Sequence, residues 1–232
     1  MTGRIHRLES LSALDGPGLR YVVFMQGCPL KCVFCHNADS LAFDGGFEME
    51  CDDLISGIRR VLPYLSGGVT FSGGEPLLQA GFCAEALSRL REMQVHTALQ
   101  TSGIGTKQGL RRVFAVCDLV MLDIKAATED GYANSTQGTA KLSDALCAIG
   151  TALELGCAVQ IRHVVLPGIN DTKQAMNTLV KTLAPFGVRP TLVPYHTMGL
   201  HKWPAESPVA HLPAADAALV AGLQAYVDAA SM

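Results

Sequence analysis

Apolar runs and helix-like segments alternate along the chain. Six short runs are mainly apolar and do not alternate regularly with polar residues, which predicts strands that are covered on both faces of a sheet. They lie at residues 21–27, 68–72, 95–101, 118–124, 157–165 and 188–194. Six other segments carry apolar residues at helical spacing or are rich in alanine, and these predict helices. They lie at residues 50–62, 76–93, 107–116, 141–155, 172–185 and 213–229.

Each predicted strand precedes a predicted helix, which favours a parallel sheet with right-handed crossover connections. Six such units are fewer than the eight of a closed barrel, which needs about 250 residues. We therefore predict an α/β fold, a partial (open) parallel (β/α)6 barrel, with a doubly wound sheet as the alternative. We expect the chain, residues 1–232, to form a single domain, with a long loop at 196–212. In both architectures, functional side chains gather at the carboxyl ends of the strands.

Composition narrows the classes of protein that fit. Hydrophobic residues make up 49% of the 232 positions, and 18 Lys and Arg against 21 Asp and Glu give a formal net charge of −3. This balance predicts no surface for nucleic acid. No apolar run reaches the roughly 18 residues of a membrane span, and the first residues lack the apolar stretch of a secretory signal. We therefore expect a cytoplasmic protein with no membrane partner.

Three of the eight cysteines lie close together after the first predicted strand. Cys28, Cys32 and Cys35 have the spacing C-x3-C-x2-C, and His36 follows directly. Thiolates this close converge on a metal or a cluster. Zinc held by the cysteines and His36 is one alternative, and covalent haem through C-x-x-C-H is another, although haem attachment requires export. A cubane cluster on three thiolates is favoured, because it leaves one iron open to bind another group.

Polar groups follow four further predicted strands. The second strand ends in S-G-G-E-P at 72–76 and the third in Q-T-S-G at 100–103. Glycines at such a junction let a ligand approach the backbone, but a tight turn with nothing bound explains them equally well. Asp123 and Lys125 close the fourth strand on the same side, as ligand-binding groups or as an ordinary ion pair. His196 follows the sixth strand.

Arg162 stands inside the fifth predicted strand, which is otherwise apolar. A charge in such a strand must find a partner. The other five cysteines stand singly in apolar segments, and we expect them to be small buried side chains without disulfides. They are Cys51, Cys83, Cys117, Cys147 and Cys157.

These motifs together resemble the glycyl-radical-enzyme activases of the radical S-adenosylmethionine (SAM) superfamily. The resemblance spans nearly the whole chain. Its segments are D-G-P-G-L-R at 15–20, Q-G-C at 26–28, the cysteine loop, S-G-G-E-P at 72–76, L-V-M-L-D-I-K at 119–125, I-R-H-V-V-L-P-G at 161–168, P-Y-H at 194–196 and H-K-W at 201–203.

The resemblance implies a [4Fe–4S] cluster on Cys28, Cys32 and Cys35, with SAM on the open iron. It implies that SAM is cleaved reductively to methionine and a 5′-deoxyadenosyl radical, which takes a Cα hydrogen from a glycine of a partner glycyl radical enzyme. It also implies flavodoxin or ferredoxin as electron donor, a monomer, and an oxygen-free setting. The implied cofactor contacts are Phe34, Cys35, His36, Gly73, Gly74, Glu75, Asp123, Ile124, Lys125, Arg162 and His196.

One position departs from the family pattern. Gln100 stands where the family has an Asp that helps to hold a monovalent cation, so we expect cation binding to be weakened or absent. Because Cys51 is the only cysteine between Cys35 and Cys83, we expect a single cluster. Two rival functions stay open: a radical enzyme that acts on a small molecule or a peptide, and a non-enzymatic iron–sulfur protein for electron transfer.

Overall fold

The computed structural model describes residues 1–203 and 211–230 and is built on one eight-stranded sheet. The strand order is β3-β1-β2-β4-β5-β6-β7-β8, and the six strands from β2 to β8 pair in parallel. These six confirm the predicted open, parallel α/β architecture. Their bounds are β2 Arg20–Met25, β4 Gly68–Gly73, β5 Thr97–Thr101, β6 Leu119–Asp123, β7 Ala158–Val165 and β8 Pro190–Pro194.

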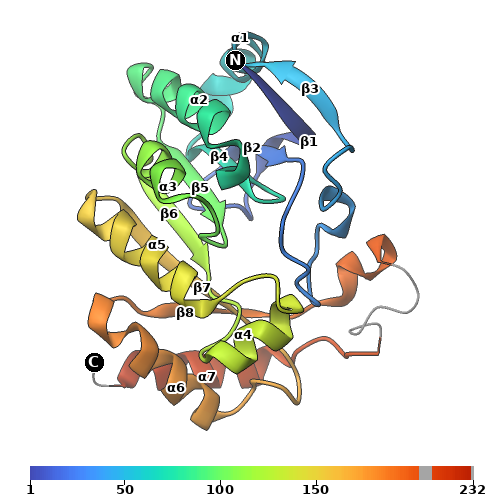
Figure 1. Ribbon diagram of the computed structural model, residues 1–232, viewed down its shortest axis with the longest axis vertical. Coiled ribbons are helices and arrows are strands. Elements are labelled where there is room, and N and C mark those ends of the chain that lie inside the picture. The colour runs from blue at the N-terminus through green and yellow to red at the C-terminus, as the bar shows by residue number, and fades with distance from the viewer. Residues whose placement is uncertain (204–210, 231–232) are drawn as a thin grey trace.

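The six predicted helices cover the outer face of this sheet (Figure 1). Each presents an apolar side to the strands, and this burial of side chains such as Ile58, Leu87 and Ile149 stabilises the fold. None of the helices within the described residues has the length and apolarity needed to cross a bilayer. The bounds are α1 Cys51–Val61, α2 Ala80–Glu92, α3 Lys107–Phe114, α5 Leu142–Glu154, α6 Lys173–Leu183 and α7 Ala217–Ala229.

The strict alternation of strand and helix was wrong at the N-terminal side of the sheet. β1 (Thr2–Ser12) and β3 (Phe47–Glu50) add two antiparallel strands there. Both carry charged residues and lie partly exposed, so they lack the continuous apolar run of a covered strand. A further helix, α4 (Glu129–Thr136), escaped prediction because it buries only Tyr132 and Thr136.

The predicted loop at 196–212 is partly ordered as helix. A 3-10 helix, η5 (Thr197–Lys202), directly follows His196, and Trp203 caps it. Residues 204–210 lie outside the described part of the chain. Short 3-10 helices also occur at Ala38–Ser40 (η1), Leu62–Tyr64 (η2), Pro76–Gln79 (η3) and Ala184–Phe186 (η4).

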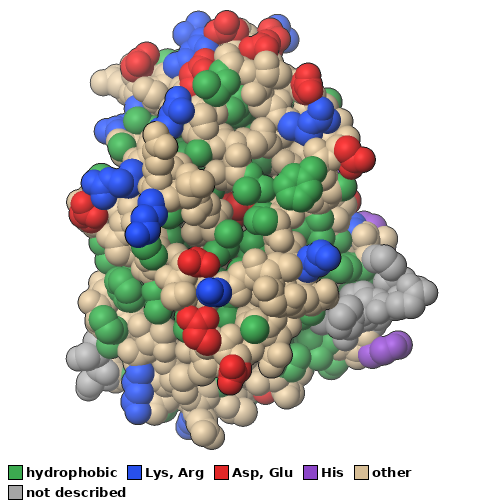
Figure 2. All heavy atoms as spheres, in the orientation of Figure 1, with side chains coloured by type: hydrophobic (Ala, Val, Ile, Leu, Met, Phe, Trp, Pro, Cys, Tyr) green, Lys and Arg blue, Asp and Glu red, His purple; other side chains and the backbone are tan. Residues whose placement is uncertain are grey.

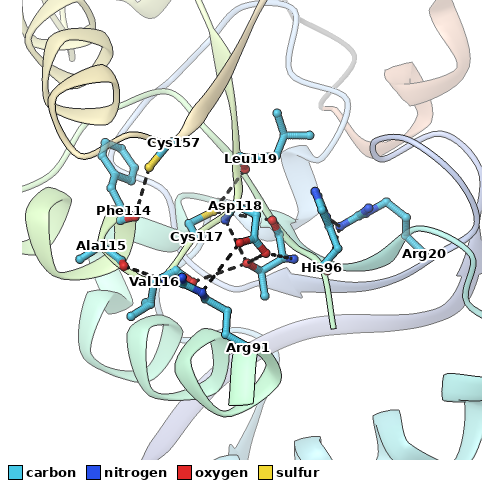
Figure 3. Close-up of polar contacts among 11 residues, drawn as sticks. Arg20, Arg91, His96, Phe114, Ala115, Val116, Cys117, Asp118, Leu119 and Cys157 are labelled. Carbon is cyan, nitrogen blue, oxygen red and sulfur yellow. Dashed lines mark hydrogen bonds and ion pairs between the residues drawn. The ribbon is translucent and has the colours of Figure 1, made fainter. Parts of the chain in front are cut away.

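A buried polar network fixes the N-terminal ends of the strands (Figure 3). The Arg20 guanidinium donates to Thr70 Oγ1 at 2.6 Å, to Val69 O at 2.8 Å and to the carbonyl of Gly67. Burial lowers the pKa of Arg20 to about 10, so this side chain stays charged at neutral pH. Asp118 accepts from the Thr97 amide and hydroxyl, each at 2.8 Å. Hydrogen bonds within the protein therefore fix this end of the sheet.

Candidate active site

One cavity of about 380 Å³ lies at the carboxyl ends of the parallel strands. Hydrophobic side chains gather across the middle of the face shown in Figure 2. Ile124 does not line the cavity, because its side chain is 1% exposed and packs in the main core. All other predicted site residues do line it: Cys28, Cys32, Phe34, Cys35, His36, Gly73, Gly74, Glu75, Asp123, Lys125, Arg162 and His196.

The cysteine loop follows β2 and is held by hydrogen bonds from three parts of the chain. The Cys28 amide donates to Leu41 O at 3.2 Å, and Val33 N donates to Ser135 O at 3.0 Å. Trp203 Nε1 donates to Cys35 O at 2.6 Å. These contacts fix the backbone of the loop before any metal is bound, so the three thiols are presented to the cavity together.

Burial keeps the three thiols protonated in the absence of metal. It raises the pKa of Cys28 to about 12 and that of Cys32 to about 11, and it also raises the pKa of Cys35. Iron binding must therefore release their protons, as thiolate ligation generally does. Within residues 1–203 and 211–230, no three His, Cys, Asp or Glu side chains converge as ligands of a single ion. The ligands of a cubane each bind a different iron and need no such convergence.

His36 contacts His196 rather than the cysteines. Its Nε2 donates to the His196 carbonyl at 2.9 Å, and the two rings stack with centroids 3.9 Å apart and planes inclined by 7°. Burial lowers the pKa of His36, so the ring is neutral and carries its proton on Nε2. Zinc with His36 as fourth ligand would require breaking this arrangement. His196 Nδ1 is buried and has no hydrogen-bond partner among the described residues.

Asp123 lies between two cations at the end of β6. Its carboxylate is 3.3 Å from Lys125 Nζ and 3.5 Å from Arg162 Nε. Burial opposes the charge on Asp123, but Lys125 and Arg162 outweigh it and lower the pKa of this carboxyl. Burial likewise opposes the charge on Lys125, and Asp123 outweighs it and raises the pKa of the amine. The formal charges of the three groups sum to +1, which suits an anionic ligand such as a carboxylate.

Gly73 and Gly74 bring the end of β4 against the cysteine loop. A Cβ on Gly74 would lie 2.2 Å from Gly27 O, and one on Gly73 would lie 2.5 Å from Met25 N. Gly73 also has a φ of +96°, which side chains rarely adopt. Glycine is therefore required at both positions because the neighbouring protein backbone is so close. Both residues also line the cavity.

The Glu75 carboxylate ties β4 to the end of β5. It is 1% exposed and accepts from Thr101 Oγ1 at 2.6 Å, from Ser102 N at 2.8 Å and from Leu77 N at 3.0 Å. Burial raises the pKa of Glu75 despite these donors. Because both oxygens already have protein donors, Glu75 supports the rim of the cavity.

We expect Glu75→Gln to lower the free energy of unfolding by about 1–3 kcal/mol, because the amide NH2 would face groups that themselves donate. Chemical denaturation of the metal-free protein measures this difference. The matched control is Glu92→Gln, at an exposed position of α2, which should leave the stability within about 0.5 kcal/mol. Equal stability of the two variants would contradict the role of Glu75 in holding the end of β4 to the end of β5.

The expectation that functional side chains gather at the carboxyl ends of the strands missed one wall of the cavity. Arg7 and Glu9 of β1, together with Phe24 of β2, line it, and the Arg7 guanidinium lies 3.8 Å from the centre of the Phe24 ring. The apolar residues Ile5, Leu8 and Leu11 are three positions apart and do not alternate with polar ones, so the pattern did not indicate β1.

Comparison with known proteins identifies the class of this site. The Radical SAM superfamily model matches residues 22–179. A pyruvate formate-lyase-activating enzyme of Clostridium pasteurianum is 40% identical over 207 residues, covering 87% of this chain and 85% of the relative. One of Staphylococcus aureus is 36% identical over 216 residues, covering 88% and 85%.

A solved structure agrees on the fold. A domain of a pyruvate-formate lyase-activating enzyme from Bacteroides vulgatus aligns with a TM-score of 0.57 at 22% identity, covering 70% of this chain and 94% of that domain. The chain therefore belongs to the radical SAM superfamily, and within it to the family of pyruvate formate-lyase-activating enzymes. This family implies a [4Fe–4S] cluster and SAM as cofactors, which confirms the predicted enzyme class.

Proposed function

We propose that the protein uses SAM and a [4Fe–4S] cluster to place a radical on a glycine of a pyruvate formate-lyase-type partner. When bound, the two cofactors supply a 5′-deoxyadenosyl radical and methionine by one-electron cleavage of the sulfonium. The observation that carries the proposal is that Cys28, Cys32 and Cys35 line the same cavity as the charged strand-end groups. Homology to activating enzymes over most of the chain supports the choice of partner.

The residues present fit both cofactors. The three cysteine thiols offer three iron ligands and leave one iron open. The net positive charge of the Asp123, Lys125 and Arg162 group suits the carboxylate of the methionyl part. The Nδ1 of His196, which has no hydrogen-bond partner within residues 1–203 and 211–230, offers a polar contact for the adenosyl part, and the stacked ring of His36 offers a flat wall.

The partner glycine would enter through an apolar opening. Leu14 follows β1 and is 87% exposed, whereas Met198 follows β8 and is 71% exposed. Both line the cavity although they come from opposite sides of the sheet. In an extended loop that entered between them, a glycine, which has no side chain, would approach the reacting atoms most closely.

An anaerobic cleavage assay tests the first half of this proposal. The protein is reconstituted with iron and sulfide, reduced with dithionite, and given SAM. We expect 5′-deoxyadenosine and methionine in equal amounts. A full cluster that leaves SAM intact, even with the partner present, would favour the electron-transfer alternative.

Gln100 supports the expectation of a weak or absent cation site. Its Oε1 accepts from Ser72 Oγ at 3.2 Å. Lys125 and Arg162 lower the pKa of Asp123 most, and a hydrogen bond from the Gln100 side chain lowers it further. Asp123 is therefore already neutralised from several sides. We propose that no monovalent cation is needed to balance it.

Removal of potassium and sodium should accordingly change the rate of SAM cleavage less than about twofold. The assay compares potassium buffer with a buffer whose only cation is tetramethylammonium, at equal ionic strength. The matched variant is Gln100→Asp, which adds a negative charge beside Asp123 and should make cleavage respond to potassium. A large loss of wild-type activity without the two ions would contradict this prediction.

The resemblance also supports finer proposals. We propose flavodoxin or ferredoxin as the electron donor and a monomeric, single-domain protein that acts in the oxygen-free cytoplasm. Gel filtration of the reconstituted protein tests the monomeric state.

A further inference from the structure

A second cavity lies on another side of the cysteine loop. It has a volume of about 380 Å³, and its lining includes Cys28, Lys31, Phe43 and Trp203. Cys28, Leu30 and Leu41 line this cavity and the active-site cavity alike, so the two cavities are neighbours. A molecule in the second cavity would touch a predicted cluster ligand without entering the active site.

The second cavity also reaches another cluster ligand. The Trp203 indole lines it, and Nε1 of this ring donates to Cys35 O at 2.6 Å. Of the three predicted iron ligands, Cys28 thus lines this surface directly, and Cys35 connects to it through the hydrogen bond from Trp203. Such short connections suit the transfer of an electron between the surface and the cluster.

The proposed reaction gains from an entrance of this kind. While SAM and the glycine of the partner fill the active-site cavity, a reducing protein would have to approach the cluster from another side. The second cavity offers that side, because Cys28 lines both cavities.

Phe43 and Lys31 give the surface its chemistry. Phe43 is 64% exposed, and its ring packs against Gly27, where a Cβ would lie 3.2 Å from Cδ1. Lys31 is exposed and is the only charged residue among the described residues that line this cavity. An apolar patch with a single cation at its edge is complementary to an acidic partner with an apolar centre.

We propose that this donor surface, formed by Cys28, Lys31, Phe43 and Trp203, docks a small acidic one-electron carrier protein. The inference rests on the proposed function, because only a redox-active cluster needs such a carrier. In the step, one electron passes from the carrier to the cluster through Cys28. The carrier is oxidised by one electron, the cluster is reduced by one, and no bond or proton changes place.

Charge reversal at Lys31 tests the proposal. We expect Lys31→Glu to lower the rate of 5′-deoxyadenosine formation roughly 10-fold when photoreduced acidic flavodoxin supplies the electrons at low salt. With dithionite, a small reductant that needs no docking surface, the rate should equal that of the wild type. The matched control is Lys181→Glu, at an exposed position of α6, which should match the wild type with both reductants.

Three further measurements separate docking from damage to the cluster. Because Lys31 stands next to Cys32 in the chain, iron and sulfide are measured in all variants and should be equal. Phe43→Ser lies outside the cysteine motif and should also slow the flavodoxin reaction while leaving the dithionite reaction unchanged. Added salt should slow the wild type with flavodoxin and have less effect on Lys31→Glu.

Equal flavodoxin-driven rates in the wild type, Lys31→Glu and Phe43→Ser would overturn the donor surface. That outcome differs from a failure of the proposed function, which would appear as a wild-type protein that does not cleave SAM with dithionite.

Discussion

Replacement of Cys32 by alanine should abolish the cluster and all cleavage of SAM. Cys32 is 7% exposed and lies in the sequence between the other two predicted ligands. Its loss leaves two thiols, and two thiols cannot hold a cubane with one open iron. We expect iron and sulfide to fall to background after reconstitution and 5′-deoxyadenosine to fall at least about 100-fold. Iron and sulfide analysis and the dithionite-driven assay measure the two effects.

The control for this substitution is another cysteine that the site does not use. The predicted burial of Cys147 was wrong, because this residue lies on the exposed side of α5, and Cys147→Ala should keep the cluster and the activity. If Cys32→Ala assembled a cluster and cleaved SAM at the wild-type rate, the assignment of the three ligands would be wrong.

Loss of the His196 side chain should weaken SAM binding and spare the cluster. The substitution His196→Ala removes the ring that stacks on His36 at 3.9 Å and the buried Nδ1 that we assign to the cofactor. A hydrogen bond to SAM contributes about 0.5–1.5 kcal/mol, whereas the stack on His36 exists without SAM and only helps to orient the His36 ring. We therefore expect the SAM concentration for half-maximal cleavage to rise up to roughly 10-fold.

The cluster spectrum is the second readout for His196→Ala and should be unchanged, since His196 is not an iron ligand. The exposed His211 provides the control, because His211→Ala should bind SAM as the wild type does. An unaltered SAM requirement in His196→Ala would contradict the role of this side chain in the cofactor site.

The parallel part of the fold was predictable because its strands are mainly apolar and alternate with helix-like segments along the chain. The antiparallel addition was not, since β1 and β3 lie at the side of the sheet and half of their side chains face solvent. α4 shows the same limit for helices, because a segment with two buried residues has no apolar stripe to detect.

The site was predictable to the extent that parallel strands bring their carboxyl ends to one edge. This rule placed Asp123, Lys125 and His196 in one cavity, although His196 is far from the other two in sequence. It could not show that Gly74 packs on the Gly27 carbonyl. A glycine is needed wherever something approaches the backbone closely, whether that is a ligand or another part of the protein. The lining by Arg7 and Glu9 depends on β1, which the apolar runs did not reveal.

Transfer of hydrogen from the partner tests the central claim most directly. Pyruvate formate-lyase labelled with deuterium at the Cα of glycine is incubated anaerobically with the reduced, reconstituted protein and SAM. The account predicts a glycyl radical by electron paramagnetic resonance, with one deuterium in each 5′-deoxyadenosine formed. Formation of 5′-deoxyadenosine without deuterium and without a glycyl radical would contradict it and would favour a radical enzyme with a different substrate.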